Sequence, residues 1–156
     1  TLREVLEKFS DKLMINIELT NYKSISDGLA KKTSFLVKEL GVQNSIFFSS
    51  FHPINLIITK RLLPEVPVAL LTIPGRAGWF SRSGLLRWIS PDLIHPYYKD
   101  VDHAYIEKQH HHNRKVNIWT INDPVEMEKF VHAKIDGLIT DDPLLGRKII
   151  DRNDTD

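Results

Sequence analysis

One segment, Val116–Pro143, constrains the fold of this chain more than any other. It begins with Val116–Ile121, which is rich in β-branched and aromatic residues, as a half-buried strand should be. Asp123 can cap a helix whose first residue is Pro124, a position where the missing N–H of proline costs nothing. The segment therefore predicts a strand that leads directly into a helix.

The rest of the segment predicts a crossover back to a second strand. Met127, Phe130 and Val131 fall at positions i, i+3 and i+4, which is one apolar face of a helix. A second strand is predicted at Leu138–Thr140. Two strands joined by a helix in so short a span should be parallel, in a right-handed crossover. We therefore expect the chain to repeat this unit.

The same alternation of strands and helices runs through the chain. Strands are predicted at Leu13–Thr20, Ser45–Phe51, Val66–Thr72, Leu93–Tyr97, Val116–Ile121 and Leu138–Thr140. Helices are predicted after a Thr1/Glu4 capping box, at Gly28–Leu40, from Pro53 to Pro64, at Val101–His112, after Pro124 and at Pro143–Ile150. A polar loop, Asn21–Asp27, is expected after the first strand.

Three details of these elements are also predicted. The Pro53 helix is expected to bury a stripe of Ile54, Ile57, Ile58 and Leu62, and the Val101–His112 helix to turn Val101, Ala104 and Tyr105 inward. Ile73–Pro91, with its prolines, glycines, two tryptophans and three arginines, is expected to be a loop with a short helix around Leu85–Ile89. Such an insertion is either functional, for example a lid, or a plug that seals the end of a barrel.

Parallel strands with helical crossovers place the chain in the α/β class. No G-x-G-x-x-G follows the strand Leu13–Thr20, so a nucleotide-binding doubly wound sheet is not indicated. The other fold with parallel strands is the eight-stranded barrel. The six strand–helix units of this chain are two fewer than such a barrel needs. The sequence thus predicts an incomplete TIM (β/α)8 barrel over residues 1–150, followed by a polar tail, Asp151–Asp156, that should fray.

Composition limits the classes of partner. The chain has 21 basic and 20 acidic residues, which gives no electrostatic case for nucleic acid or an anionic membrane as the main partner. It has no cysteine, hence no disulfide framework, and its apolar runs are too short for a membrane span. No signal-peptide pattern is visible, so a cytoplasmic location is expected. Because the chain begins with Thr1 rather than Met, it is interpreted as a segment of a longer protein.

Glu18 and Trp119 are the side chains that the strand pattern places in a barrel interior. Glu18 lies near the end of its strand, on the polar face with Asn16 and Thr20. A carboxylate there is either a ligand for a hard metal ion or a buried Glu paired to a cation. Trp119 shares a strand face with Asn117, and either walls a pocket or fills the core.

The histidines and the acidic pair are weaker candidates. His52 and His95 each follow a strand core, where each would face the barrel mouth or stand as an ordinary loop residue. His110–His112 are three consecutive residues that cannot all ligate one ion from a regular helix, so they are interpreted as a solvated helix end. The pair Asp141-Asp142 is interpreted as the cap of the last helix rather than a cation site.

Four motifs resemble the glycerophosphodiester phosphodiesterase family in order and spacing. They are NIEL at Asn16–Leu19, SSFHP at Ser49–Pro53, VPVALLT at Val66–Thr72, and WTIND followed by DGLITDDP within Val116–Pro143. The resemblance implies a metal-dependent barrel enzyme that hydrolyses glycerophosphodiesters to glycerol 3-phosphate and an alcohol. It also implies a divalent cation, Ca²⁺ or Mg²⁺, held by carboxylates, with two histidines as general acid and base.

The family's site residues transfer only in part. Glu18 matches the metal-binding glutamate, and Trp119 matches the tryptophan near the substrate pocket. Thr20 stands where the family commonly has a phosphate-binding Lys. Its hydroxyl can donate one hydrogen bond to phosphate but carries no charge, so phosphate affinity or substrate choice should differ unless an Arg such as Arg76 supplies the missing charge. The acid/base histidines and the other carboxylates belong to units that would precede Thr1, so no catalytic residue is expected in this segment.

The sequence therefore predicts a phosphoric diester hydrolase of lipid metabolism for the complete protein, with a small-molecule phosphodiester as substrate. This segment alone is expected to be inactive. The alternative is a non-catalytic truncated or degenerate barrel that binds a ligand or another chain. An open parallel barrel exposes strand edges and core surface, so self-association of the segment is expected. A third reading, a barrel phosphodiesterase acting on phosphoinositides or sphingolipids, fits the C-terminal motifs less well.

Overall fold

The computed structural model describes residues 1–21, 24 and 27–153. The chain forms two compact units. Unit 1 consists of Thr1–Leu71 and Leu86–Asp92, and unit 2 of Thr72–Leu85 and the residues from Leu93 onward. In both units strands alternate with helices, and every strand pairing described below is parallel. The predicted α/β class is therefore confirmed. Part of the predicted loop Asn21–Asp27 lies outside the described residues.

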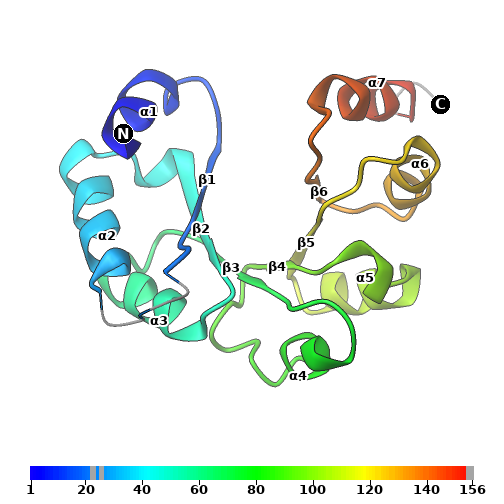
Figure 1. Ribbon diagram of the computed structural model, residues 1–156, viewed down its shortest axis with the longest axis horizontal. Helices are drawn as coiled ribbons and strands as arrows, with labels where there is room; N and C mark the ends of the chain where they lie inside the picture. Colours follow the sequence, from blue (N-terminus) through cyan, green and yellow to red (C-terminus); the bar gives the residue numbers. More distant parts are fainter. Residues whose placement is uncertain (22–23, 25–26, 154–156) are drawn as a thin grey trace. The chain divides into compact units, whose positions relative to one another are not determined.

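Unit 1 places its helices on one side of three strands (Figure 1). The strands are β1 (Ile15–Glu18), β2 (Ile46–Ser50) and β3 (Val68–Leu71), and the helices are α1 (Leu2–Phe9), α2 (Leu29–Leu40), α3 (Pro53–Leu62) and the 3-10 turn η1 (Gln43–Ser45). β1 pairs with β2 from Ile15↔Ile46 to Glu18↔Ser49, and β2 pairs with β3. One apolar core joins the strands to the helices, with Leu6, Val37 and Leu56 completely buried.

Two expectations for unit 1 are corrected. β1 begins at Ile15 rather than Leu13, because the amides of Lys12 and Leu13 bond to the carbonyl of Phe9 and prolong the turn that ends α1. The expected apolar stripe of α3 is confirmed for Ile57, Ile58 and Leu62, which pack partly buried against the core, and wrong for Ile54, which is exposed. The fully buried residues of α3 are Asn55, Leu56 and Thr59. The predicted capping box is present, with the Thr1 side chain accepting from the amide of Glu4.

Unit 2 repeats the arrangement around a second core. Its elements are η2 (Arg76–Gly78), α4 (Trp79–Arg82), β4 (Leu93–His95), η3 (Tyr98–Asp100), α5 (His103–His111), β5 (Lys115–Ile118), α6 (Pro124–His132), β6 (Gly137–Leu138) and α7 (Pro143–Asn153). β4 pairs with β5, and β5 with β6. The predicted cap of α6 is confirmed, because Asp123 accepts from the amides of Val125 and Glu126. Met127 and Phe130 are buried, as their spacing indicated.

Three expectations for unit 2 are corrected. The short helix of the 73–91 insertion is α4, at Trp79–Arg82, whereas residues 85–89 form turns. α4 lies earlier because Arg82 donates to the carbonyls of Ile73 and Gly75, which fixes one turn of helix against the loop. Val101 and Tyr105 pack partly buried against the core as expected, but Ala104 is exposed, and the fully buried residues of α5 are Ile106 and Gln109. α7 continues to Asn153, so half of the expected tail is helical, and residues 154–156 lie outside the described residues.

Candidate functional site

Glu18 is the last residue of β1 and lies on the exposed face of that strand. Its neighbours Ile17 and Leu19 are 6% and 1% exposed and face the helices, whereas Glu18 and Thr20 face the opposite way. The predicted alternation is therefore confirmed at this end of β1. The carboxylate is a hard oxygen donor at the carboxyl end of a parallel strand, the end where (β/α)8 enzymes build their active sites.

A buried polar network fixes the chain just after Glu18. Asn55 donates to the side-chain oxygens of Asn21 (2.6 Å) and Ser50 (3.0 Å), and Ser50 in turn donates to the carbonyl of Leu19 (2.9 Å). Asn21, Ser50 and Asn55 are 8%, 0% and 0% exposed. The network ties the ends of β1 and β2 to the first turn of α3, so it sets the backbone course on both sides of Thr20.

The same network reaches the start of α2 through Asp27. The Asp27 carboxylate accepts from the amide of Leu29 (2.9 Å) and the side chain of Asn21 (3.0 Å), and these hydrogen bonds lower its pKa. The sequence pattern missed Asn21 and Asn55, because each is an ordinary loop or helix residue by itself. Their partners lie 34 positions apart in the chain, which no local pattern reveals.

In unit 2 the corresponding strand ends carry His95, Asn117 and Trp119. The side-chain amide of Asn117 contacts Nε2 of His95 at 3.0 Å, and the indole N–H of Trp119 donates to the carbonyl of His95 at 2.7 Å. Trp119 is half-buried and packs on Tyr97, with ring centroids 5.5 Å apart. The Trp119 ring is thus held in place from two sides.

His95 is a buried strand residue rather than a loop residue. It is completely buried at the end of β4, and burial together with the nearby Arg114 guanidinium lowers its pKa to about 4. The imidazole is therefore neutral at physiological pH. His52, by contrast, is only partly buried and lies at the N-cap of α3. Glu18 and His52 belong to unit 1, whereas His95 belongs to unit 2.

Arg114 is a buried cation that the sequence did not indicate. It is 1% exposed and donates to the carbonyl of Leu93 and to the side chain of Gln109, each at 3.3 Å. Tyr105 is also largely buried, and this burial raises the pKa of its phenol to about 12. Unit 2 thus encloses a titratable imidazole, His95, and a guanidinium, Arg114. The phenol of Tyr105 stays protonated.

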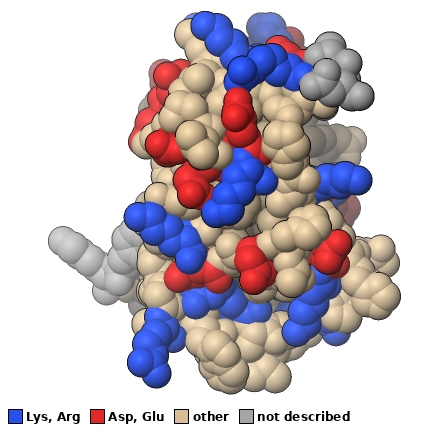
Figure 2. Space-filling model, turned by 90° about the vertical axis from the view of Figure 1, so that its right-hand side faces the viewer, with Lys and Arg blue, Asp and Glu red and all other residues tan. Residues whose placement is uncertain are grey.

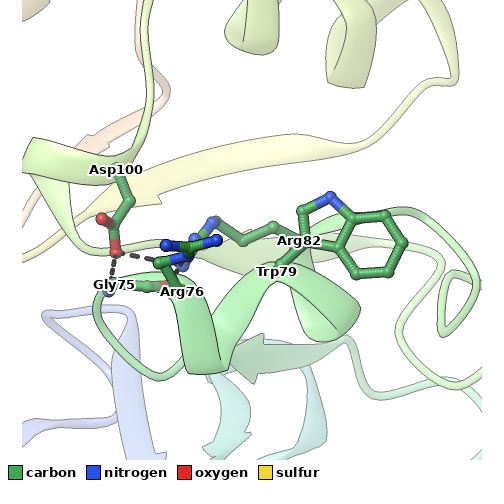
Figure 3. A pocket seen from close by; sticks show the side chains of 5 residues that line it. All are labelled: Gly75, Arg76, Trp79, Arg82 and Asp100. Carbon is green, nitrogen blue, oxygen red and sulfur yellow. Dashed lines mark hydrogen bonds and ion pairs between the residues drawn. The ribbon is translucent and has the colours of Figure 1, made fainter.

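A cavity of about 520 Å³ opens beside α4 (Figure 3), lined by Gly75, Arg76, Trp79, Arg82 and Asp100. The Asp100 carboxylate accepts from the amide of Gly75 (2.6 Å) and pairs with Arg82 (3.0 Å). Figure 3 shows the indole of Trp79 pointing away from this pair. Arg76 makes no ion pair with the part of the chain that the structure describes, so it supplies the uncompensated positive charge of the cavity.

The WTIND and DGLITDDP motifs interlock around Asn122. Its side-chain oxygen accepts from the hydroxyl of Thr140 (3.0 Å) and the amide of Asp141 (2.9 Å), and its side-chain amide donates to Asp141 (2.7 Å). Asp142 accepts from the amide of Leu145, which confirms the predicted cap of α7. Gly137 faces the Asn117 side chain so closely that a Cβ there would collide with it. These residues therefore hold the strand ends of unit 2 together.

Several further ion pairs lie at the surface. Basic and acidic side chains are interspersed on the face shown in Figure 2. His110 contacts Asp136 at 2.8 Å, and the same Asp136 oxygen accepts from the amide of Val116.

Within residues 1–21, 24 and 27–153, no group of three or more His, Cys, Asp or Glu side chains could hold a metal ion. Over the same residues, no helix has the length and apolar character needed to cross a bilayer.

Comparison with known proteins identifies one family. Residues 1–145 match the model of the glycerophosphoryl diester phosphodiesterase family. A glycerophosphodiester phosphodiesterase of Caldanaerobacter subterraneus subsp. tengcongensis is 28% identical over 144 residues, which are 92% of this chain and 58% of that protein. The chain therefore spans a little over half the length of this relative.

Solved structures agree on the fold. A glycerophosphodiester phosphodiesterase from Parabacteroides distasonis matches 99% of this chain and 65% of its own, with a TM-score of 0.85 and 21% identity. An Oleispira antarctica phosphodiesterase, solved in complex with the product sn-glycerol-3-phosphate, matches 95% of this chain and 58% of its own, with a TM-score of 0.67 and 24% identity. The predicted partial (β/α)8 barrel is thus confirmed as the fold.

Proposed function

Because this chain belongs to the glycerophosphoryl diester phosphodiesterase family, we propose that the complete protein hydrolyses glycerophosphodiesters to glycerol 3-phosphate and an alcohol. The observation that carries the proposal is Glu18. It ends β1 on the exposed face, and the resemblance of the NIEL motif matches it to the family's metal-binding glutamate. The relative from Oleispira antarctica binds the product sn-glycerol-3-phosphate, which supports the same product class here.

This chain would supply only one of the several ligands that a divalent cation needs. Glu18 offers the oxygen donor that Ca²⁺ or Mg²⁺ prefers. A single carboxylate does not hold a divalent cation, and the described residues form no group of three ligating side chains. We therefore assign Glu18 as one ligand and derive no catalytic step from this chain alone. When bound, the cation would polarise the phosphoryl oxygens of the substrate.

Two further side chains are assigned to substrate binding. Trp119, fixed by its bond to the His95 carbonyl and by Tyr97, would form a flat apolar wall against the glycerol moiety. Thr20 is exposed directly beyond Glu18 and would donate one hydrogen bond to the phosphate. Because a hydroxyl brings no charge, phosphate affinity should rest more on the metal than in relatives with a Lys at this position.

The test replaces Glu18 by Gln in the full-length protein and follows release of glycerol 3-phosphate from glycerophosphocholine with added Mg²⁺ or Ca²⁺. We expect kcat/KM to fall at least about 100-fold, since a metal ligand is lost without loss of volume. The matched control is Glu65→Gln, another exposed glutamate of unit 1. Wild-type metal-dependent turnover by the Glu18 variant would disprove its role.

A non-catalytic binding module is the second candidate function, and Thr20 in place of the family's Lys is the observation that favours it. The two candidates differ in one measurement, which is turnover by the full-length protein. Metal-dependent release of glycerol 3-phosphate supports the hydrolase, whereas calorimetric binding of glycerol 3-phosphate without turnover supports the module. For the 156-residue chain itself we propose no turnover and self-association, measured by sedimentation velocity.

A further inference from the structure

We propose that the segment from Ile73 to Leu85 docks onto a lipid surface that carries anionic headgroups. This segment contains η2 and α4 and belongs to unit 2. The docking surface consists of the exposed apolar side chains Ile73, Trp79, Phe80 and Leu85 together with Arg76. The proposal does not depend on the catalytic role of Glu18, because its readout is binding and needs no turnover.

The exposure of these apolar side chains is the first observation. Trp79 is 67% exposed, Leu85 60%, Phe80 52% and Ile73 51%. Large apolar side chains that lie singly on a surface need no explanation, but four exposed ones within thirteen consecutive positions, two of them adjacent aromatic residues, favour a segment that binds an apolar layer. Tryptophan is the residue most favoured at the boundary between lipid headgroups and acyl chains.

The surface is rigidly presented, which is the second observation. Arg82 donates to the carbonyls of Ile73 (2.9 Å) and Gly75 (2.7 Å) and pairs with Asp100 (3.0 Å). A side chain at Gly78 would collide with the carbonyl of Ile73, so the loop is closed tightly on itself. These polar bonds fix the backbone of α4, so the exposed side chains of Trp79 and Phe80 can bind with little further ordering of the backbone.

Charge distinguishes a lipid surface from other occupants. The insertion Ile73–Pro91 contains three arginines and no acidic residue. Arg82 is neutralised by Asp100, but Arg76 is exposed and makes no ion pair among the described residues. A second copy of this segment would bring like charges together, whereas an anionic bilayer offers both an apolar layer for the aromatic rings and a partner for Arg76.

The test measures co-sedimentation of the 156-residue chain with sucrose-loaded vesicles of phosphatidylcholine, with and without 30% phosphatidylserine. We expect binding that rises with the phosphatidylserine fraction and falls with salt. The double variant Trp79→Ala/Phe80→Ala should lower the partition coefficient at least about 10-fold. Both side chains are exposed, so circular dichroism should show an unchanged fold.

The matched control is Leu144→Ala, because Leu144 is an even more exposed apolar residue (76%) on another element of unit 2, α7. Its binding should equal that of the wild type. Equal binding by the double variant and the wild type would overturn the proposal, as would wild-type binding that does not respond to phosphatidylserine. Loss of dimers instead of loss of vesicle binding, seen by sedimentation velocity, would also overturn it and assign the surface to a second copy.

Discussion

The two units stabilise their strand ends with different chemistry. In unit 1 the buried polar side chains that join β1, β2 and α3 are neutral, namely Asn21, Ser50 and Asn55. In unit 2 the buried polar groups near β4 and β5 include an imidazole, His95, and a guanidinium, Arg114. A nearly buried ion pair, Arg82–Asp100, holds the neighbouring loop.

The difference teaches where this fold is sensitive to its surroundings. The neutral side chains of this network exchange no protons, and the one carboxylate that the network reaches, Asp27, has a lowered pKa and stays ionised between pH 5 and pH 7.5. The contribution of the network to stability should therefore not change over this pH range. Buried ionisable groups carry a desolvation cost that only their partners offset. The free energy of unfolding should therefore change strongly when a partner is removed or when the group gains a proton. Unit 2 should therefore respond to pH and to single charge deletions more than unit 1.

The largest effect is expected for Asp100→Ala. The substitution leaves Arg82 without its anion and removes the acceptor of the Gly75 amide, at a pair whose side chains are only 13% and 15% exposed. We expect the free energy of unfolding to fall by about 3 kcal/mol, measured by urea denaturation. In the control Asp151→Ala, which removes an exposed pair with Arg147, the loss should stay below about 0.5 kcal/mol.

A pH dependence traceable to His95 comes next. The unfolded imidazole takes up a proton near pH 6.5, whereas the folded one stays neutral down to about 4, so the unfolded state binds more protons between these values. The free energy of unfolding should therefore decrease by about 2 kcal/mol from pH 7.5 to pH 5 on account of this residue. His95→Gln should flatten the pH profile by that amount. An identical profile for variant and wild type would show that burial does not suppress protonation of His95.

The smallest of these effects is expected for Asn55→Ala in unit 1. It leaves the side-chain oxygen of Asn21 without its 2.6 Å donor in a buried place. The loss should be about 1.5 kcal/mol, and it should be the same at pH 5 and pH 7.5. Asn44→Ala, at an exposed position of the same unit, is the control with little expected change. A pH-dependent loss for Asn55→Ala would break the contrast between the units.

Local sequence signals predicted much of the fold. The helix caps at Thr1, Asp123 and Asp142 could all be predicted, because each capping side chain and the amides that donate to it lie within three residues of each other. The order of strands and helices followed from the same local punctuation. Of the candidate site, the exposed side of β1 that carries Glu18 followed from alternation along the strand.

Other features were decided only by the tertiary structure. The buried face of α3 includes Asn55 and not Ile54, because the Asn55 side chain donates hydrogen bonds to Asn21 and Ser50. Asn21 is 34 residues away in sequence, so no local pattern indicates this contact. The position of α4 depends on Arg82 reaching the carbonyls of Ile73 and Gly75 and pairing with Asp100.

The sequence by itself therefore determined the element order, the capped starts of α1, α6 and α7, and the family motifs, since these depend on neighbours along the chain. The tertiary structure alone decided which polar groups are buried, such as His95 and Arg114, and which apolar groups remain exposed, such as Trp79. The physical reason is that desolvation depends on every atom packed around a group, and most of those atoms belong to distant parts of the chain.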